Sequence, residues 1–360
     1  MKADDVKKKL KSKAPLPQPT QKDFLSTGSV MLNMAMTGRP NCGFLKGLYY
    51  FLVGDSQSGK TFLALTCLAE AALSPAFKEH RFIFDNGENG ALMSMEKFFG
   101  RAMASRLEPP CTKDGEPVFS ETVEQFYYHL DYAVKDGRPF IYILDSMDVL
   151  SSEPEQDKFD EKREAFEKGK STSGSYGDGK AKINSQQLRQ VLGALRKTGS
   201  ILIIINQTRD NLGFGFEKKS RSGGHALTFY ASMELWSSVT GKIKKIVKGS
   251  PRQIGTFCQV RLKKNRVNGK DRSVTVPIYW SCGIDDVGSM VDYLVEEKHW
   301  TKKDKGDTII AKDLDLEMSR EKLIRHIQDN DMEKDVQEIV RDVWDEIEAA
   351  CEVQRKRRYE

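Results

Sequence analysis

The chain has 360 residues, of which 39% are hydrophobic and 30% are charged, and its net charge is +5. This length predicts about two domains, and the composition suits a soluble protein with a substantial core. The six cysteines form no C-x-x-C pair, which argues against a zinc cluster or a disulfide framework. No segment reaches the roughly 18 apolar residues of a membrane span, and the Lys-rich beginning lacks the apolar region of a secretory signal.

The N-terminal region predicts an arm and then a short helix. A Lys-rich beginning and a proline-spaced linker occupy residues 1–25, either as a solvated tail or as an arm that binds a partner. A helix is expected over residues 30–36, with Ser26 or Thr27 as its cap.

The next segment carries the strongest functional signal of the chain. Residues 54–61 fit the P-loop pattern G-x-x-x-x-G-K-[ST], between an apolar strand over 48–53 and a helix over 62–69. Backbone N–H groups of such a loop turn toward phosphates, and the helix N-terminus adds partial positive charge. We predict that Lys60 reaches the β- and γ-phosphates and that Thr61 holds Mg²⁺. The predicted nucleotide-binding residues are Gly54, Asp55, Ser56, Gln57, Ser58, Gly59, Lys60 and Thr61.

Two further apolar runs predict strands that lead into acidic residues. Residues 81–85 precede Glu88, and residues 140–145 end in Asp145. Helices are expected over 91–107 and 122–134. Such alternation predicts a mostly parallel sheet with helices on both faces and ligands at the carboxyl ends of the strands. Asp145 is a candidate Mg²⁺ ligand, and Glu88 a candidate for activating the attacking water.

Two polar segments, residues 151–182 and 208–224, predict long mobile loops. A helix over 184–197 and a strand over 201–207 separate them. We expect Gln207, at the end of that strand, to sense the γ-phosphate and to pass the signal to the second loop. This loop contains four cations and two phenylalanines, namely Arg209, Phe214, Phe216, Lys218, Lys219 and Arg221. Such cations can track the phosphates of a nucleic acid, and the two phenylalanines would either insert between bases or hold the loop on its own core.

The remaining segments predict a strand-rich region and a separate C-terminal module. Strands are expected over residues 228–239, 255–262 and 272–280, with a basic segment over 242–252 and a helix over 288–297. Residues 313–352 carry fourteen Asp or Glu against five Lys or Arg. Helical spacing over 321–327 and 333–353 predicts a small helical module at 301–360, following a core at 26–300.

These segments resemble the RecA recombinase family, including its phage UvsX-type members, from about Phe24 to Glu297. The match over residues 223–232, which closes the second DNA-binding loop, is the most specific. Glu88 resembles the catalytic Glu of the family, although Gly87 sets it one residue further from Asp85. The other matching segments are 26–29 at the start of the core, 54–61 as Walker A, 143–146 as Walker B and 204–209 around the allosteric Gln.

The resemblance implies an α/β fold with a RecA-like P-loop ATPase core and with ATP and Mg²⁺ as cofactors. It implies catalytic roles for Lys60, Glu88, Asp145 and Gln207. It also implies DNA contacts for the four cations and two phenylalanines of the second loop. Lys264 and Arg266 resemble the basic pair that, in bacterial members, reaches the ATP of a neighbour in the filament.

The resemblance also implies a DNA strand-exchange recombinase in the cytoplasm of a bacterium or a phage-infected cell. The implied partners are single- and double-stranded DNA, further copies in a helical filament, and single-strand-binding or mediator proteins, without a membrane. Two alternatives stay open, a hexameric RecA-fold helicase or translocase and a DNA-binding regulatory module with little turnover.

Overall fold

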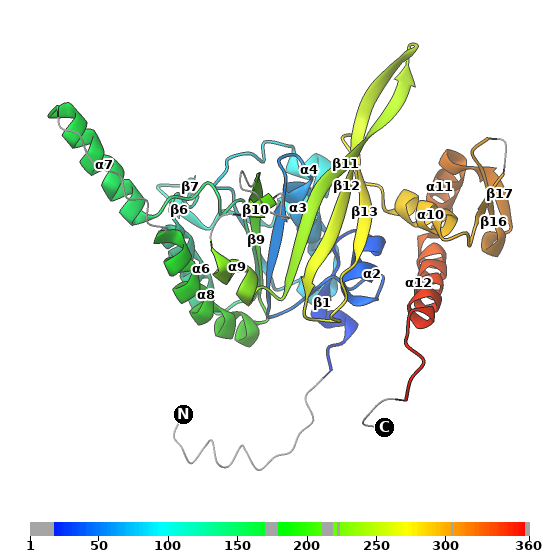
Figure 1. The fold of residues 1–360 in the computed structure, drawn as a ribbon, viewed down its shortest axis with the longest axis horizontal. Coiled ribbons are helices and arrows are strands. Elements are labelled where there is room, and N and C mark those ends of the chain that lie inside the picture. Colours follow the sequence, from blue (N-terminus) through cyan, green and yellow to red (C-terminus); the bar gives the residue numbers. More distant parts are fainter. Residues whose placement is uncertain (1–17, 170–178, 211–218, 222–223, 304–305, 357–360) are drawn as a thin grey trace.

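The computed structural model describes residues 18–169, 179–210, 219–221, 224–303 and 306–356. Its centre is a ten-stranded sheet in the order β14-β13-β12-β11-β3-β9-β8-β4-β5, with β10 beside β9 (Figure 1). The pairs from β11 to β5 along this order are parallel, and β12, β13 and β14 continue the sheet as antiparallel strands. The strands are β3 (Tyr49–Gly54), β4 (Arg81–Asp85), β5 (Leu107–Glu108), β8 (Phe140–Leu144), β9 (Ile201–Asp210), β10 (Lys219–Arg221), β11 (Met233–Val247), β12 (Ser250–Asn265), β13 (Ser273–Tyr279) and β14 (Gly283–Ile284).

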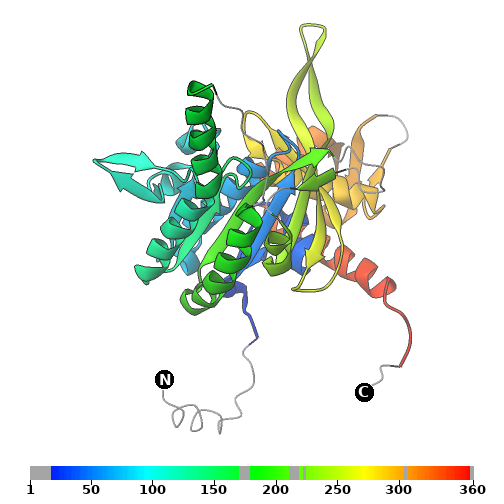
Figure 2. The same ribbon diagram turned by 60° about the vertical axis from the view of Figure 1, so that its left-hand side comes forward.

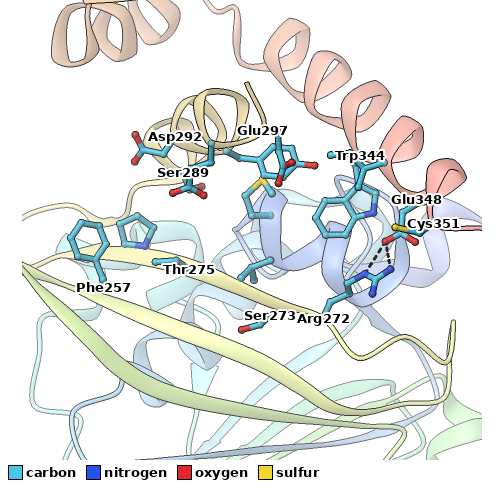
Figure 3. Close-up of a pocket in the computed structure, with 16 residues that line it drawn as sticks. Phe257, Arg272, Ser273, Thr275, Ser289, Asp292, Glu297, Trp344, Glu348 and Cys351 are labelled. Carbon is cyan, nitrogen blue, oxygen red and sulfur yellow. Dashed lines mark hydrogen bonds and ion pairs between the residues drawn. The ribbon is translucent and has the colours of Figure 1, made fainter. Parts of the chain in front are cut away.

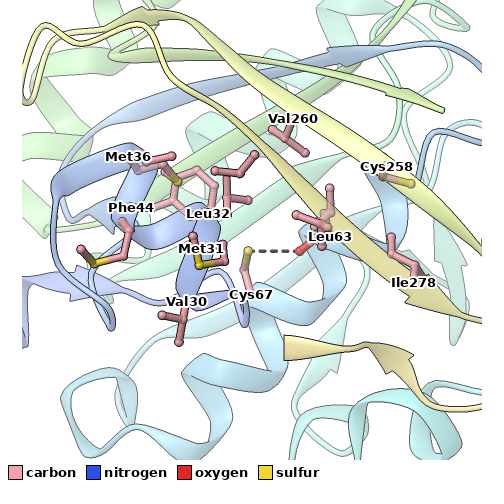
Figure 4. Close-up of a cluster of buried hydrophobic side chains, with 14 of the residues drawn as sticks. Val30, Met31, Leu32, Met36, Phe44, Leu63, Cys67, Cys258, Val260 and Ile278 are labelled. Atoms are coloured by element: carbon pink, nitrogen blue, oxygen red, sulfur yellow. Dashed lines mark hydrogen bonds between the residues drawn. The ribbon is translucent and has the colours of Figure 1, made fainter. Parts of the chain in front are cut away.

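Helices cover both faces of this sheet, so the predicted α/β architecture is confirmed (Figure 2). Side chains of β3 alternate between two cores, because successive residues of a strand project to opposite faces. Tyr50 and Leu52 belong to one core, and Tyr49 and Phe51 belong to the other. The first core includes α2 (Val30–Thr37), α3 (Lys60–Leu73), α4 (Met95–Phe99), α5 (Arg101–Ala104) and α10 (Asp286–Glu296); the second includes α6 (Val123–Lys135), α8 (Gly179–Thr198) and α9 (His225–Tyr230). Figure 4 shows the first core, where Leu63 and Cys67 of α3 lie near Met31 of α2.

The helix expected over residues 91–107 is interrupted. Gly100, with φ +82°, separates α4 from α5, and β5 follows at the edge of the sheet. Beyond it, β6 (Cys111–Lys113) and β7 (Glu116–Val118) form a small hairpin that we did not predict. At the N-terminal end, β1 (Phe24–Leu25) pairs with β2 (Phe44–Leu45), and Ser29, rather than Ser26 or Thr27, caps α2.

The prediction of a structureless loop over 151–182 was wrong for most of its described part. Residues 153–167 form helix α7 (Glu153–Glu167), and α8 begins at Gly179. Ser152 and Glu155 form a capping box at the start of α7, and Arg163–Asp160 and Lys168–Glu164 pairs follow at 3.1 and 3.2 Å. Charged residues with good helix propensity sustain this helix although it has no buried residue.

The basic segment 242–252 is not a connection between two strands. It belongs to β11 and β12, which pair from Met233–Asn265 to Val247–Ser250 and extend as a ribbon beyond the sheet (Figure 1). Residues 225–230, part of which we expected in a strand, form α9 instead. The predicted hairpin after Asn265 is confirmed, because β12 and β13 pair antiparallel across Asn268 and Gly269.

The C-terminal segment contains the two expected helices, α11 (Arg320–Asp329) and α12 (Glu333–Ala350), and also a three-stranded sheet. Its strands are β15 (Thr301–Lys302), β16 (Thr308–Ala311) and β17 (Leu316–Ser319). Leu323 and Val340 share the first hydrophobic core, and Arg272 Nη2 binds Glu348 Oε1 at 2.5 Å (Figure 3). A cavity of about 550 Å³ lies between α10, α12 and β13. In the described part of the chain, no helix has the length and apolarity to cross a membrane.

Candidate nucleotide site and DNA interface

The P-loop motif forms the strand–loop–helix unit that we predicted from the sequence. Gly54 ends β3, and Gly59, with φ +80°, is the N-cap of α3. A Cβ atom at Gly54 would lie 2.2 Å from the backbone oxygen of Ser237, and a Cβ atom at Gly59 would lie 2.6 Å from Ile278 Cδ1. Both positions therefore need glycine, because any side chain would push the loop away from the sheet.

Side chains from α3, β9, β12, β13 and the segments after β4 and β8 meet in a cavity of about 390 Å³ beside this loop. Its lining residues are Ser56, Gln57, Ser58, Gly59, Lys60, Thr61, Phe62, Glu88, Gly90, Met93, Asp145, Gln207, Thr256, Cys258, Ile278 and Trp280. The structure thus brings Glu88, Asp145 and Gln207 to the P-loop, as expected for groups at the carboxyl ends of parallel strands. Gly54 and Asp55 begin the same loop.

Lys60 and Asp145 form the charged centre of the cavity. The Lys60 side chain is buried, and its Nζ donates a hydrogen bond to the backbone oxygen of Asp55 at 2.6 Å. Burial lowers the pKa of Lys60, while attraction to Asp145, Glu88 and Asp55 opposes that effect. Burial raises the pKa of Asp145 to about 6, with Glu88 adding repulsion and a hydrogen bond from Thr61 acting in the opposite direction. These two side chains provide a cation and a carboxylate, both largely buried, within one site.

The residues present fit a phosphate-bound Mg²⁺ ion. Thr61 Oγ1 donates to Asp145 Oδ2 at 2.6 Å, so a hydroxyl and a carboxylate already lie side by side. The other carboxylate oxygen, Oδ1, is buried without a hydrogen-bond partner among the described residues, and so is Ser58 Oγ. Buried polar atoms without partners are rare in native proteins, and oxygen atoms are the ligands that Mg²⁺ prefers.

Two hydrogen bonds connect the cavity with the beginning of the second loop. Gln207 Nε2 donates to Glu88 Oε1 at 2.6 Å, and Thr208 Oγ1 donates to Asp55 Oδ1 at 2.5 Å. The backbone N–H of Gln207 also donates to the carboxylate of Asp148. The backbone N–H of Glu88 donates to the Asp145 oxygen at 2.8 Å, which ties the two acidic strand ends together. A change at the phosphates can therefore reach residue 208 through directly bonded groups.

Sequence reasoning missed several residues of this site. Trp280 follows β13, lines the cavity and is 58% exposed, and Thr256 lines the same cavity from β12. Asp148 and Thr208 complete the hydrogen bonds described above. A tryptophan at a strand end was visible in the sequence. Its place at this edge depends on β13 running in the same direction as β3, which two antiparallel pairings decide.

Lys264 and Arg266 lie away from the cavity of their own chain. Lys264 Nζ donates to the Thr228 and Phe229 oxygens at 2.6 and 2.9 Å, and Arg266 Nη2 donates to the Phe229 oxygen at 2.8 Å. Both cations thus meet the carboxyl end of α9, where they also complement the helix dipole. Met233 of β11 pairs with Asn265 on one side and with Tyr50 of β3 on the other. Tyr50 precedes Gly54 by four residues, so the two cations lie about 13 Å along the strands from the P-loop edge.

The second predicted DNA loop is described only in part. Phe214, Phe216 and Lys218 lie outside the described residues. The backbones of Arg209 in β9 and of Lys219 and Arg221 in β10 form an antiparallel pair of strands, with Thr208 opposite Arg221. This part of the expected flexible loop is therefore a short hairpin that continues β9 beyond the cavity.

Comparison of the sequence with known proteins relates the chain to Protein RecA. The model of the RecA N-terminal domain matches residues 131–285. Protein RecA of Chlorobium limicola is 30% identical over 281 residues, which cover 77% of this chain and 70% of that protein. Protein RecA of Trichodesmium erythraeum is 28% identical over 326 residues, which cover 89% of this chain and 80% of that protein.

Among solved structures, the crystal structure of the RadB recombinase matches with a TM-score of 0.48 and 18% identity. That match covers 72% of this chain and 98% of the other. The sequence relationship to Protein RecA, over more than two thirds of both chains, shows that this protein is a member of the RecA family.

Proposed function

We propose that this protein is a DNA-dependent ATPase that assembles on single-stranded DNA and catalyses strand exchange. The observation that carries the proposal is the pair of hydrogen bonds from Gln207 to Glu88 and from Thr208 to Asp55. These bonds join the nucleotide cavity to the segment that matches the second DNA-binding loop of the family. A nucleotide site and a DNA loop that share bonded residues are the minimum that ATP-dependent DNA binding requires.

For hydrolysis, each residue has a role that follows from its position. Lys60 would neutralise the β- and γ-phosphates, and the P-loop N–H groups would hold them in place. Thr61 and Asp145 would hold Mg²⁺, which when bound supplies charge stabilisation to the phosphates. Glu88 would accept a proton from the attacking water, and release of Gln207 from Glu88 would leave its carboxylate available for that task.

For DNA binding, the second loop is the better candidate of the two that we predicted. Helix α7, which forms most of the described part of the first loop, carries seven acidic and three basic residues, and its net charge of −4 opposes contact with phosphates. Arg209, Lys219 and Arg221 lie on the short hairpin that leaves the cavity edge. We propose this hairpin, together with residues 211–218, as the single-strand contact.

For assembly, Lys264 and Arg266 are proposed to act on the ATP of a neighbouring copy. Their distance from their own P-loop supports a role between protomers, because neither reaches the cavity of its own chain. A cation supplied by a neighbour would make turnover depend on assembly, as an arginine finger does.

The test measures ATP hydrolysis with and without single-stranded DNA, and then strand exchange between that DNA and a homologous duplex. We expect hydrolysis that DNA stimulates, complexes whose mass grows with DNA length, and exchanged product. A fixed hexamer with unwinding activity would instead indicate a helicase or translocase. DNA binding without turnover would indicate a regulatory module, and the strand-exchange proposal would then be wrong.

A further inference from the structure

Two elements project from the body at the edge of the sheet where the P-loop lies. One is helix α7, which follows β8, and the other is the end of the β11–β12 hairpin, here called the basic ribbon (residues 240–256). Figures 1 and 2 both show them projecting from the body, and in Figure 1 they point away from each other. Strands β3 and β9 separate β8 from β11 in the sheet, so the two projections arise at different places on one protomer.

Helix α7 presents a continuous acidic face. Asp157, Asp160, Glu161 and Glu164 have the spacing i, i+3, i+4, i+7, which places them on the same side of a helix. Like charges at this spacing repel one another, although Asp160 pairs with Arg163 and Glu164 pairs with Lys168 within the helix. Phe159 and Phe166, which are 67% and 84% exposed, lie on the opposite side of the helix. The acidic face therefore offers negative charge to solvent, and a cationic partner would relieve its remaining repulsion.

The basic ribbon has the opposite character. Residues 235–270 contain no Asp or Glu, and the ribbon itself contains five cations, Lys242, Lys244, Lys245, Lys248 and Arg252. Lys245 lies directly opposite Arg252 in the antiparallel register, an arrangement that destabilises a strand pair. Ile246 and Val247 near the tip are 75% and 42% exposed. The ribbon thus offers positive charge and apolar surface, and an anionic partner would relieve its repulsion.

We propose that α7 of one protomer docks on the basic ribbon of the next protomer in the assembly. The acidic face belongs to a helix with a net charge of −4, and it would meet a ribbon with a net charge of +5. Because the two surfaces differ, the contact is head-to-tail and leaves a free α7 at one end and a free ribbon at the other. Such a contact propagates an open chain of subunits. The inference rests on the self-assembly included in the proposed function, and it names the surfaces that meet.

The test uses charge reversal on each surface. Variant A carries Asp157→Lys, Asp160→Lys, Glu161→Lys and Glu164→Lys, which changes the net charge of α7 from −4 to +4 and leaves the Ser152–Glu155 cap and both phenylalanines unchanged. Variant B carries Lys242→Glu, Lys244→Glu, Lys245→Glu and Lys248→Glu, which changes the net charge of the ribbon from +5 to −3. The matched control reverses four exposed acids on α12, by Asp335→Lys, Glu338→Lys, Asp345→Lys and Glu346→Lys. Assembly with ATP and single-stranded DNA is followed by light scattering and sedimentation, and circular dichroism checks that each variant is folded.

Variants A and B should each need at least about tenfold more protein to assemble than the wild type, because like charges would meet. The control should behave as the wild type does. An equimolar mixture of A and B should recover assembly. The cationic helix of A can dock on the anionic ribbon of B, and the anionic helix of B can dock on the cationic ribbon of A. Only a direct contact between these two surfaces predicts such recovery.

Each other outcome overturns the inference in a distinguishable way. If the wild type and both variants assemble alike, the contact is wrong and the proposed function stands. If variant B loses affinity for DNA and mixing with A restores nothing, the ribbon binds nucleic acid. If the wild type does not assemble with ATP and DNA, the self-assembly in the proposed function fails, and this contact fails with it.

Discussion

Replacing Asp145 by Asn should make the nucleotide-free protein more stable while removing its ATPase activity. The Asp145 side chain is buried, and its Oδ1 has no hydrogen-bond partner among the described residues. Burial, together with repulsion from Glu88, raises its pKa from the ordinary 3.8 to about 6. The ionised carboxylate is thus held in the folded protein at a cost in stability. Asn has the same shape without the charge, and its amide can keep the contact with Thr61.

The size of the effect follows from this pKa. A folded-state pKa above the unfolded value means that the folded protein binds the proton more tightly, so stability falls as pH rises from about 4 to 6. The change from 3.8 to about 6 corresponds to about 3 kcal/mol, fully lost above pH 6. The gain in the Asn variant at pH 7.5 should approach this value, which already includes the attraction between Asp145 and Lys60. At pH 5 it should be about half as large.

The assay is urea unfolding of both proteins at pH 7.5 and pH 5 without Mg²⁺. Glu121→Gln, an exposed change near α6, is the control and should leave the free energy of unfolding unchanged. Mg²⁺ should stabilise the wild type more than the Asn variant, because the variant lacks a ligand charge. An Asn variant that is less stable than the wild type, or a difference that does not depend on pH, would refute this reasoning.

Three further predictions concern the cavity and its surroundings. Lys60→Ala should lower ATP hydrolysis at least about a hundredfold, measured as phosphate release, and near-normal turnover would rule out the P-loop assignment. Arg266→Ala should be inactive alone but regain some activity when mixed with Lys60→Ala, whereas an inactive mixture under assembly conditions would exclude a role in trans. ATP should change the tryptophan fluorescence, because Trp280 lines the cavity, and Trp280→Phe should remove that change. If ATP still changes the fluorescence of the Trp280→Phe variant, the adenine base does not lie beside Trp280.

A fifth prediction tests the second loop as the DNA contact. Replacing Arg209, Lys218, Lys219 and Arg221 together by Ala should weaken single-stranded DNA binding and flatten its dependence on salt, because fewer counterions are released. DNA-independent hydrolysis should survive. Unchanged affinity and salt slope, measured by fluorescence anisotropy, would remove this loop from the interface.

The local parts of the site could be predicted from sequence because their geometry is local. The P-loop needs glycine at fixed spacing, an apolar strand before it and a helix after it, and all three lie within about 25 residues. Asp145, Glu88 and Gln207 follow apolar strands, and parallel strands bring such residues to one edge. Their meeting in one cavity follows from that rule, whereas the hydrogen bond from Gln207 to Glu88 needed coordinates.

The sequence itself determined the P-loop motif beside the cavity and the α/β class of the fold. Both follow from motifs and uninterrupted apolar strands that can be recognised without knowledge of distant residues. Tertiary structure decided which distant segments meet. It brought Trp280 to the cavity and carried Lys264 to the opposite end of the sheet, because antiparallel pairing of β11, β12 and β13 sets their register. It also showed α7 and the basic ribbon as projecting elements with opposite charge. Polarity alone cannot distinguish a solvated helix or ribbon from a loop, since all three bury little apolar surface.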